Sequence, residues 1–223
     1  MRHQKMYIIL ATIFTIGGLY VCDQIFELPY VMKVGVKLIL FLVLPLYYML
    51  QTKENIFLQS FKNRDKHVRL NLSHLLGFLI IVVLIVTYLI VKPTINLSVF
   101  QEEFEQKYKI NRDNLLLYGI YFTFVNSLLE EFFFRGFMFL ELKKLNMKKT
   151  AYFTSSLAFS IYHIGNIQNW FNVWIFFLAI LGLFVGGIIF NYLDDRQNTF
   201  FNSWLVHICA DLALVWIGYD LLR

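Results

Sequence analysis

The chain has 223 residues, of which 58% are hydrophobic, 18% aromatic and 16% charged. A typical globular domain has about 45–50% apolar and about 25% charged residues, and a soluble protein of this size cannot hide so much apolar surface. The net charge of +5 does not indicate nucleic-acid binding, because the lysines and arginines lie between apolar blocks and favour topology signals and contacts to anionic lipid. The composition therefore predicts an integral membrane protein.

The apolar blocks predict an all-α, polytopic membrane helix bundle of about seven transmembrane helices, since one span needs about 20 mostly apolar residues. The expected spans cover residues 6–22, 34–50, 75–91, 114–142, 150–164, 170–193 and 200–222. Pro45 should kink the second span, and charged residues interrupt the fourth. We find no internal repeat and no low-complexity linker, so residues 1–223 are expected to form a single membrane domain.

The basic residues favour a cytoplasmic N-terminus under the positive-inside rule. The larger, inner set is Arg2, Lys5, Lys53, Lys62, Arg64, Lys66, Arg69, Lys143, Lys144, Lys148, Lys149 and Arg196. The smaller set, outside or at the outer boundary, is Lys33, Lys37, Lys92, Lys107, Lys109, Arg112 and Arg223. The charged loop 92–113 also carries Ile95, Val99, Phe100, Phe104 and Tyr108, a loose stripe that fits either an interfacial helix or a solvated connector.

The fourth span contains Glu130, Glu131 and Arg135 within an apolar stretch. Glu131 and Arg135 are four residues apart and can pair along the helix, whereas Glu130 is rotated by about 100° and has no partner in its own helix. Both glutamates could instead merely bound the helix at the interface, but Glu130 lies roughly 18 Å before the lysines that follow. We therefore expect Glu131 to be structural and Glu130 to be available as a general base.

Two further spans carry polar side chains at helical spacing. The fifth ends with Phe159 and His163, and the seventh carries His207 and Asp211, each pair four residues apart. Taken singly, these residues are also compatible with ordinary hydrogen bonds between helices. At 1.5 Å per residue, however, Glu130, His163 and His207 fall at comparable depths, about 12–20 Å from the cytoplasmic ends of their spans. One carboxylate and two imidazoles can therefore meet in one buried layer.

Such a group of side chains can activate a water molecule in two ways. Glu130 and His163 can deprotonate it for attack on a peptide carbonyl while His207 and a neighbour stabilise the oxyanion. Alternatively, His163, His207 and Glu130 can bind zinc, which lowers the pKa of its bound water. The spacings match no standard zinc motif.

Three motifs occur in order along successive spans: Glu-Glu-x-x-x-Arg at 130–135, Phe-x-x-x-His at 159–163 and His-x-x-x-Asp at 207–211. Together they resemble the CAAX protease and bacteriocin-processing (CPBP, or Abi) family of intramembrane endopeptidases, over about residues 115–214. The resemblance implies that Glu130 is the catalytic base, that His163 assists it, and that His207 and Asp211 complete the site and hold the oxyanion. It also implies that Glu131 and Arg135 brace the helix, that Phe159 packs against the site, and that no metal or other cofactor is needed.

The resemblance places the catalytic core in the four C-terminal helices, residues 114–223, after N-terminal helices and an interfacial loop in residues 1–113. It implies peptide-bond hydrolysis in a membrane-bound or hydrophobic substrate, with roles such as bacteriocin processing, signal-peptide processing or self-immunity, in a multi-pass protein of a bacterial cell membrane. The expected partners are that substrate and the lipid bilayer, not nucleic acid. Two alternatives remain open: a non-catalytic immunity or scaffold protein, and a small proton-coupled transporter that uses Glu130, His163 and Asp211 as a relay.

Overall fold

The protein is an all-helical bundle in a computed structural model that describes residues 2–62, 70–94, 102–107, 109–167 and 172–222. No strand occurs in these ranges, which confirms the predicted fold class. The larger helices are α1 (Arg2–Gln24), α2 (Tyr30–Thr52), α3 (Ile56–Lys62), α4 (Leu70–Val91), α9 (Lys148–Tyr162), α11 (Val173–Asp195) and α12 (Phe201–Leu221). The shorter segments are η2 (Lys92–Thr94), η3 (Glu103–Lys107), α6 (Leu115–Ile120), η4 (Tyr121–Asn126), α7 (Ser127–Glu131), η5 (Phe132–Leu140), α8 (Glu141–Lys144) and α10 (Ile164–Ile167).

Among the described residues, five helices are long and apolar enough to cross a membrane, which confirms a polytopic protein. They are α1, α2, residues Leu72–Val91 of α4, α11 and α12. The fourth expected span is divided among the segments from α6 to α8, and the fifth corresponds to α9, which has only 15 residues. The total of seven spans therefore stays a prediction.

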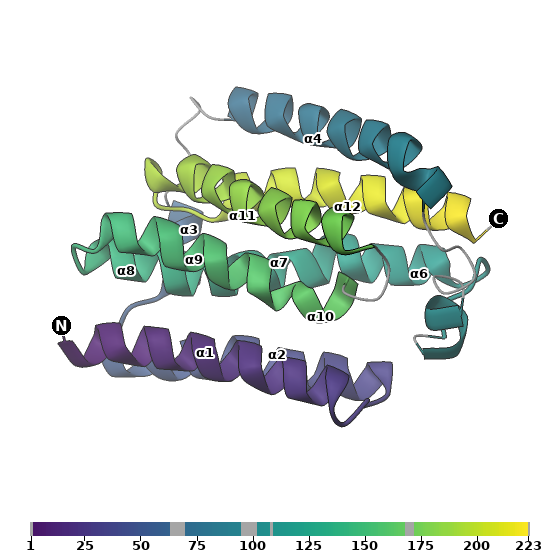
Figure 1. Ribbon diagram of the computed structural model, residues 1–223. Helices are drawn as coiled ribbons and strands as arrows, with labels where there is room; N and C mark the ends of the chain where they lie inside the picture. The colour runs from purple at the N-terminus through teal and green to yellow at the C-terminus, as the bar shows by residue number, and fades with distance from the viewer. Residues whose placement is uncertain (1, 63–69, 95–101, 108, 168–171, 223) are drawn as a thin grey trace.

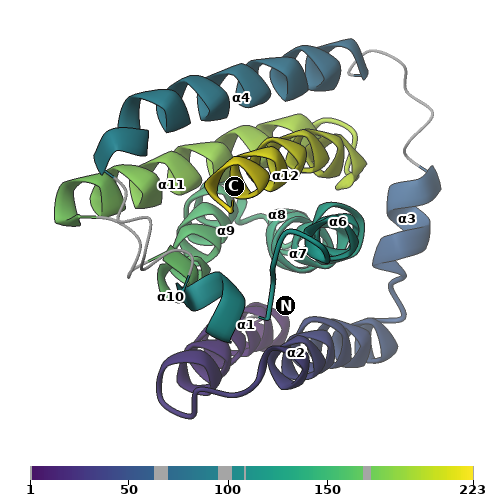
Figure 2. The same cartoon turned by 90° about the vertical axis from the view of Figure 1, so that its right-hand side faces the viewer.

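The segments from α6 to α8 follow one another along a single axis at the centre of the bundle. Figure 2 shows this run end-on, with α1 and α2 on one side and α11 and α12 on the other. All nine residues of η5 are buried, and this segment packs against α1, α2, α3, α9 and α11. A helix that is covered on every side must be apolar all round, which explains the phenylalanines at positions 132, 133, 134, 137 and 139.

Two π-helical segments, η4 and η5, flank the short helix α7 that carries Glu130 and Glu131. A π turn is wider than an α turn and is frequently found at functional sites. The widening rotates the residues that come after it about the helix axis. The direction of the two carboxylates therefore depends on η4, the segment before α7. The hydrophobic pattern alone could not predict this local geometry.

Helices α9 and α11 approach closely at Gly187. A Cβ atom added there would lie 2.9 Å from Cα and Cβ of Ser156, closer than real atoms pack. Near this point, Asn191 of α11 donates to the Tyr152 carbonyl (3.2 Å) and to the Ser156 hydroxyl (3.1 Å). Small residues and polar side chains of this kind commonly join helices in membranes, and here they fix α9 beside the central run.

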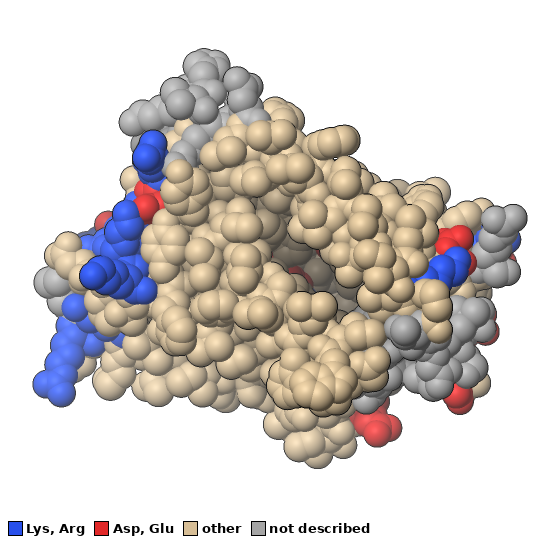
Figure 3. Space-filling model, turned by 45° about the horizontal axis from the view of Figure 1, so that its top comes forward, with Lys and Arg blue, Asp and Glu red and all other residues tan. Residues whose placement is uncertain are grey.

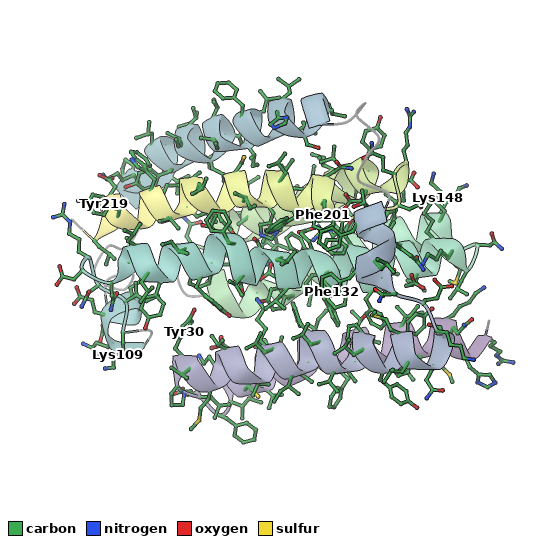
Figure 4. All side chains as sticks on the ribbon, turned by 180° about the vertical axis from the view of Figure 1, so that it is seen from behind. Tyr30, Lys109, Phe132, Lys148, Phe201 and Tyr219 are labelled. Carbon is green, nitrogen blue, oxygen red and sulfur yellow. The ribbon has the colours of Figure 1, made fainter. Side chains whose placement is uncertain are left out.

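On the surface of the bundle, the charged side chains lie at the two ends and apolar side chains lie between them. Figure 3 shows lysines and arginines gathered at the ends of a largely uncharged face. In Figure 4, Lys148 is at one end, Lys109 and Tyr219 are at the other, and Phe132 lies between them. Large apolar side chains such as Phe78, Ile90 and Trp174 are exposed on the periphery. This distribution suits a lipid environment.

Three details of the N-terminal half bear on the sequence predictions. The assignment of Lys37 to the outer boundary is wrong, because α2 begins at Tyr30 and buries Lys37 in the bundle. Pro45 lies inside α2, which continues to Thr52. Of the predicted stripe in loop 92–113, residues 95, 99, 100 and 108 lie outside the described residues, and Phe104 packs against Tyr88 and Leu221.

Candidate active site

Glu130 is buried at the centre of the bundle, and one of its carboxylate oxygens accepts three hydrogen bonds. Lys37 Nζ of α2 donates to Oε1 at 2.7 Å, Asn126 Nδ2 at 2.9 Å and Tyr162 Oη of α9 at 3.1 Å. Lys37 also donates to the side-chain oxygen of Asn126. Three separate segments of the bundle therefore hold Oε1.

The other oxygen of Glu130, Oε2, is buried and has no hydrogen-bond partner among the described residues. It faces two imidazole rings: His163 Nε2 lies 3.7 Å away and His207 Nε2 lies 3.9 Å away. Buried polar atoms in proteins nearly always have a partner. Like Glu131 Oε2 and Asp211 Oδ2, Glu130 Oε2 therefore calls for a hydrogen-bond donor such as a water molecule.

The outer nitrogens of both imidazoles are occupied, which fixes the role of the inner ones. His163 Nδ1 lies 2.8 Å from the Phe159 carbonyl oxygen, and His207 Nδ1 lies 2.7 Å from Glu131 Oε1. Because a carbonyl or carboxylate oxygen only accepts, each Nδ1 must carry the hydrogen. In the neutral ring Nε2 is then an acceptor. Two acceptor nitrogens and one acceptor oxygen thus converge on the same small space.

Glu131 is the second buried carboxylate of α7, and it links the central helix to α12. Its Oε1 accepts from Arg135 Nη1 at 3.0 Å, so the predicted pairing along the helix is present. The same oxygen accepts from His207, and Glu131 therefore orients a histidine of the site as well as balancing Arg135. The Arg135 guanidinium lies over the rings of Phe159 (4.1 Å) and Phe190 (4.8 Å).

Asp211 and Phe159 lie at the edge of this group. Asp211 Oδ1 is 3.7 Å from His207 Nε2, and its side chain is 14% exposed against 3% for Glu130. The Phe159 ring packs edge-on against His163 and His207, with ring centres 4.6 and 5.9 Å apart. Figure 3 shows a hollow in the apolar face with an acidic side chain at its floor.

The structure brings together all the side chains that the motifs singled out. Helices α7, η5, α9 and α12, with His163 directly after α9, supply them, and the convergence expected from helix depth is present. The expectation that Glu130 has no partner in its own helix is wrong, because Asn126, one turn earlier, donates to it. It is also not an unpaired carboxylate, since Lys37 forms an ion pair with it.

Sequence reasoning missed three side chains on Glu130: Asn126, Tyr162 and Lys37. The four-residue spacing from Asn126 to Glu130 was a visible signal, and so was the position of Tyr162 directly before His163. Lys37 lies 93 residues from Glu130 in the sequence, and its only signal was a lysine at the start of an apolar block. Only the packing of α2 against the central run shows where this cation lies.

The zinc alternative does not fit this arrangement. Among the described residues, no group of three or more His, Cys, Asp or Glu side chains is placed to hold a metal ion. The Lys37 ammonium already balances the charge of Glu130 at 2.7 Å, and a divalent cation beside it would be repelled.

Comparison with known protein families finds a match over the C-terminal half of the chain. Residues 112–213 match the model of the Rce1-like family, described as type II CAAX prenyl endopeptidase Rce1-like. The matched region carries all three motifs, which confirms the resemblance to the CAAX protease family. Proteins of this class are intramembrane proteases, so protease activity is the general function that the match indicates. The same comparisons found no match to a curated protein and none to a solved structure.

Proposed function

We propose that the protein is an intramembrane endopeptidase that hydrolyses a peptide bond of a membrane-bound or hydrophobic peptide with a water molecule activated by Glu130. The observation that carries this proposal is the buried, unpartnered Oε2 of Glu130, faced by the Nε2 atoms of His163 and His207. A carboxylate and an imidazole placed around one water are the groups that general-base hydrolysis needs.

In the proposed reaction the water donates one hydrogen to Glu130 Oε2 and the other to His163 Nε2. Oε2 takes the first proton as the water oxygen forms a bond to the carbonyl carbon of the substrate. When His207 is doubly protonated, it donates from Nε2 to the oxyanion while Glu131 and Asp211 balance its charge. The carbon–nitrogen bond then breaks, and Glu130 returns its proton to the leaving amine. Water is consumed, and one acid and one amine are formed.

The substrate and location that we propose follow from the surface of the bundle. The site lies at the centre of an apolar bundle whose periphery exposes large apolar side chains, so a substrate already in the bilayer can reach it most directly. We place the protein in a bacterial cell membrane with the N-terminus in the cytoplasm. Bacteriocin or signal-peptide processing and self-immunity are the roles compatible with such a substrate.

The decisive experiment compares the membrane peptides of cells that express the wild-type protein with those of cells that express Glu130→Gln. We expect at least one peptide cut by the wild type to stay whole in Glu130→Gln and in His163→Ala, with a loss of about a hundredfold or more in the cleavage rate. The matched control is Glu141→Gln, the same change at a buried carboxylate on the same central run. Glu141→Gln should cleave as the wild type does.

Two results would contradict this mechanism. Undiminished cleavage by Glu130→Gln would remove the proposed base, and a wild-type phenotype in all three variants would favour an immunity or scaffold protein without turnover. The purified enzyme also tests for a metal: we expect cleavage to continue after thorough chelation. Loss of cleavage on chelation, restored by stoichiometric zinc, would favour the metal mechanism instead.

A further inference from the structure

Lys37 is a buried cation in the N-terminal half, far from the three motifs in the sequence. It lies two turns inside α2, is 8% exposed, and reaches across to the central run, where it contacts Asn126 and Glu130. Its ammonium also lies over the rings of Phe41 (5.1 Å) and Tyr162 (5.0 Å). Aromatic faces and a carboxylate are the groups that stabilise a buried ammonium. The surroundings of Lys37 are therefore built for a positive charge.

The stability of the fold does not obviously require the ion pair between Lys37 and Glu130. Removing an ammonium from water costs several kcal/mol, and an ion pair in an apolar interior is often no more stable than apolar residues of the same volume. Arg135 already balances Glu131, the neighbouring carboxylate, so Lys37 serves Glu130. A cation retained there at such a cost points to a role in the chemistry of Glu130.

The three donors make the two oxygens of Glu130 unequal. Lys37, Asn126 and Tyr162 all donate to Oε1, and none of them donates to Oε2. Oε1 is filled and its direction is fixed, so the carboxylate cannot rotate without losing these bonds. Oε2 is left free to face both imidazoles. The arrangement selects which oxygen can take a proton.

We infer that Lys37 is a positioning residue of the active site: it fixes the carboxylate of Glu130 so that Oε2 faces the water, and its charge balances that of Glu130. This inference rests on the proposed function and deepens it, because it makes α2, which lies outside the region matched by the family model, part of the enzyme. Lys37 acts through Glu130 and does not touch the reacting atoms.

Other charged and titratable groups besides Lys37 surround Glu130 and also act on its carboxylate. Helix α9 supplies Tyr162, with His163 directly after it, and α12 supplies His207 and Asp211. Segment η4 supplies Tyr121, α7 supplies Glu131 and η5 supplies Arg135. Lys37 is the cation that forms an ion pair with Glu130, at 2.7 Å, whereas Arg135 pairs with Glu131. Removing Lys37 takes away the opposite charge that favours the ionised form of the carboxylate.

The test is the pH dependence with which Lys37→Met and Lys37→Gln cleave the peptide that the comparison with Glu130→Gln identifies. We expect the acid limb of the kcat profile to move upward by about one pH unit or more and kcat to fall about tenfold near neutral pH, with KM changed less than about twofold. Lys37→Gln removes the charge but keeps a hydrogen-bond donor on a shorter side chain. It takes the place of Lys37→Met if that variant does not fold. Lys37→Arg keeps the charge and should restore the position of the acid limb.

The control is Lys33→Met, which removes a cation one turn earlier on α2 that pairs with Asp23. It should leave the pH profile unchanged. A wild-type profile in Lys37→Gln, or an equal loss of kcat at every pH, would overturn the inference. Glu130→Gln is measured in parallel: if it still cleaves, the proposed function fails. If it is inactive while Lys37→Gln keeps the wild-type profile, only the role of Lys37 fails.

Discussion

At the scale of single residues, the site contains two buried carboxylates that the packing uses differently. Oε1 of Glu130 accepts from Lys37, Asn126 and Tyr162, and its Oε2 faces the two imidazoles of the site. Glu131 binds Arg135 and His207 through one oxygen. Two adjacent residues of one helix thus carry the same functional group with different partners, because they point about 100° apart. The residue type alone therefore does not tell which carboxylate could act as a base and which one orients its neighbours.

Arg135 is the residue whose loss should cost most in stability. It is fully buried, pairs with Glu131 and lies between Phe159 and Phe190. Arg135→Leu leaves the Glu131 carboxylate buried without its cation, so we expect a loss of about 3–5 kcal/mol. Thermal unfolding in detergent measures it. Arg112→Leu, at an exposed position, should lower the unfolding temperature much less. Equal losses in the two variants would contradict this account.

At the scale of elements, the position of the site depends on helix crossings and on the π segments. Helix α9 carries Tyr162 and is followed directly by His163, and Gly187 lets α11 pack closely against α9 at Ser156. The segment η4 sets the direction of α7 and its two glutamates. A change at a crossing should therefore affect stability without touching a catalytic side chain.

Neighbouring glycines of α11 test this crossing. Gly187→Ala places a Cβ atom 2.9 Å from the backbone of Ser156, so the helices must move apart, at a cost of about 1–3 kcal/mol. Gly186→Ala has no atom within 4 Å of the added Cβ and gains helix propensity. In thermal unfolding, Gly187→Ala should melt earlier and Gly186→Ala should match or exceed the wild type. The reverse order would show that the crossing does not limit stability.

At the scale of the whole molecule, the bundle is arranged around one central helical run. Helices α1 and α2 lie on one side of it and α11 and α12 on the other, and both sides supply a partner to Glu130. The N-terminus and the C-terminus lie at opposite ends of the bundle (Figure 1). If the bundle crosses the bilayer along its length, the two termini must lie on opposite faces of the membrane.

Reporter fusions test this topology. An enzyme that is active only in the cytoplasm, fused to the N-terminus, should be active, and the same enzyme fused to the C-terminus should be inactive. A reporter that is active only outside the cytoplasm should give the opposite pattern. The physical reason is the bias of lysine and arginine toward the N-terminal end of the bundle. Cytoplasmic activity from both fusions would contradict the topology.

Much of the class and of the site could be predicted from the sequence because the signals are local. Long apolar blocks predict membrane helices whatever their packing, since the bilayer sets their length. The pairing of Glu131 with Arg135 follows from four-residue spacing. The convergence of Glu130, His163 and His207 followed from counting residues along each span.

What only the tertiary structure decided concerns contacts between helices that are distant in sequence. Lys37 was predicted to lie at the outer boundary, and the packing of α2 against the central run places it on Glu130 instead. Tyr162 and the choice between the two oxygens of Glu130 follow from the same packing. The sequence by itself determined a membrane bundle with a candidate set of acids and histidines, because those depend on composition and helical period. The tertiary structure decided which atoms face one another, because that depends on how the helices cross.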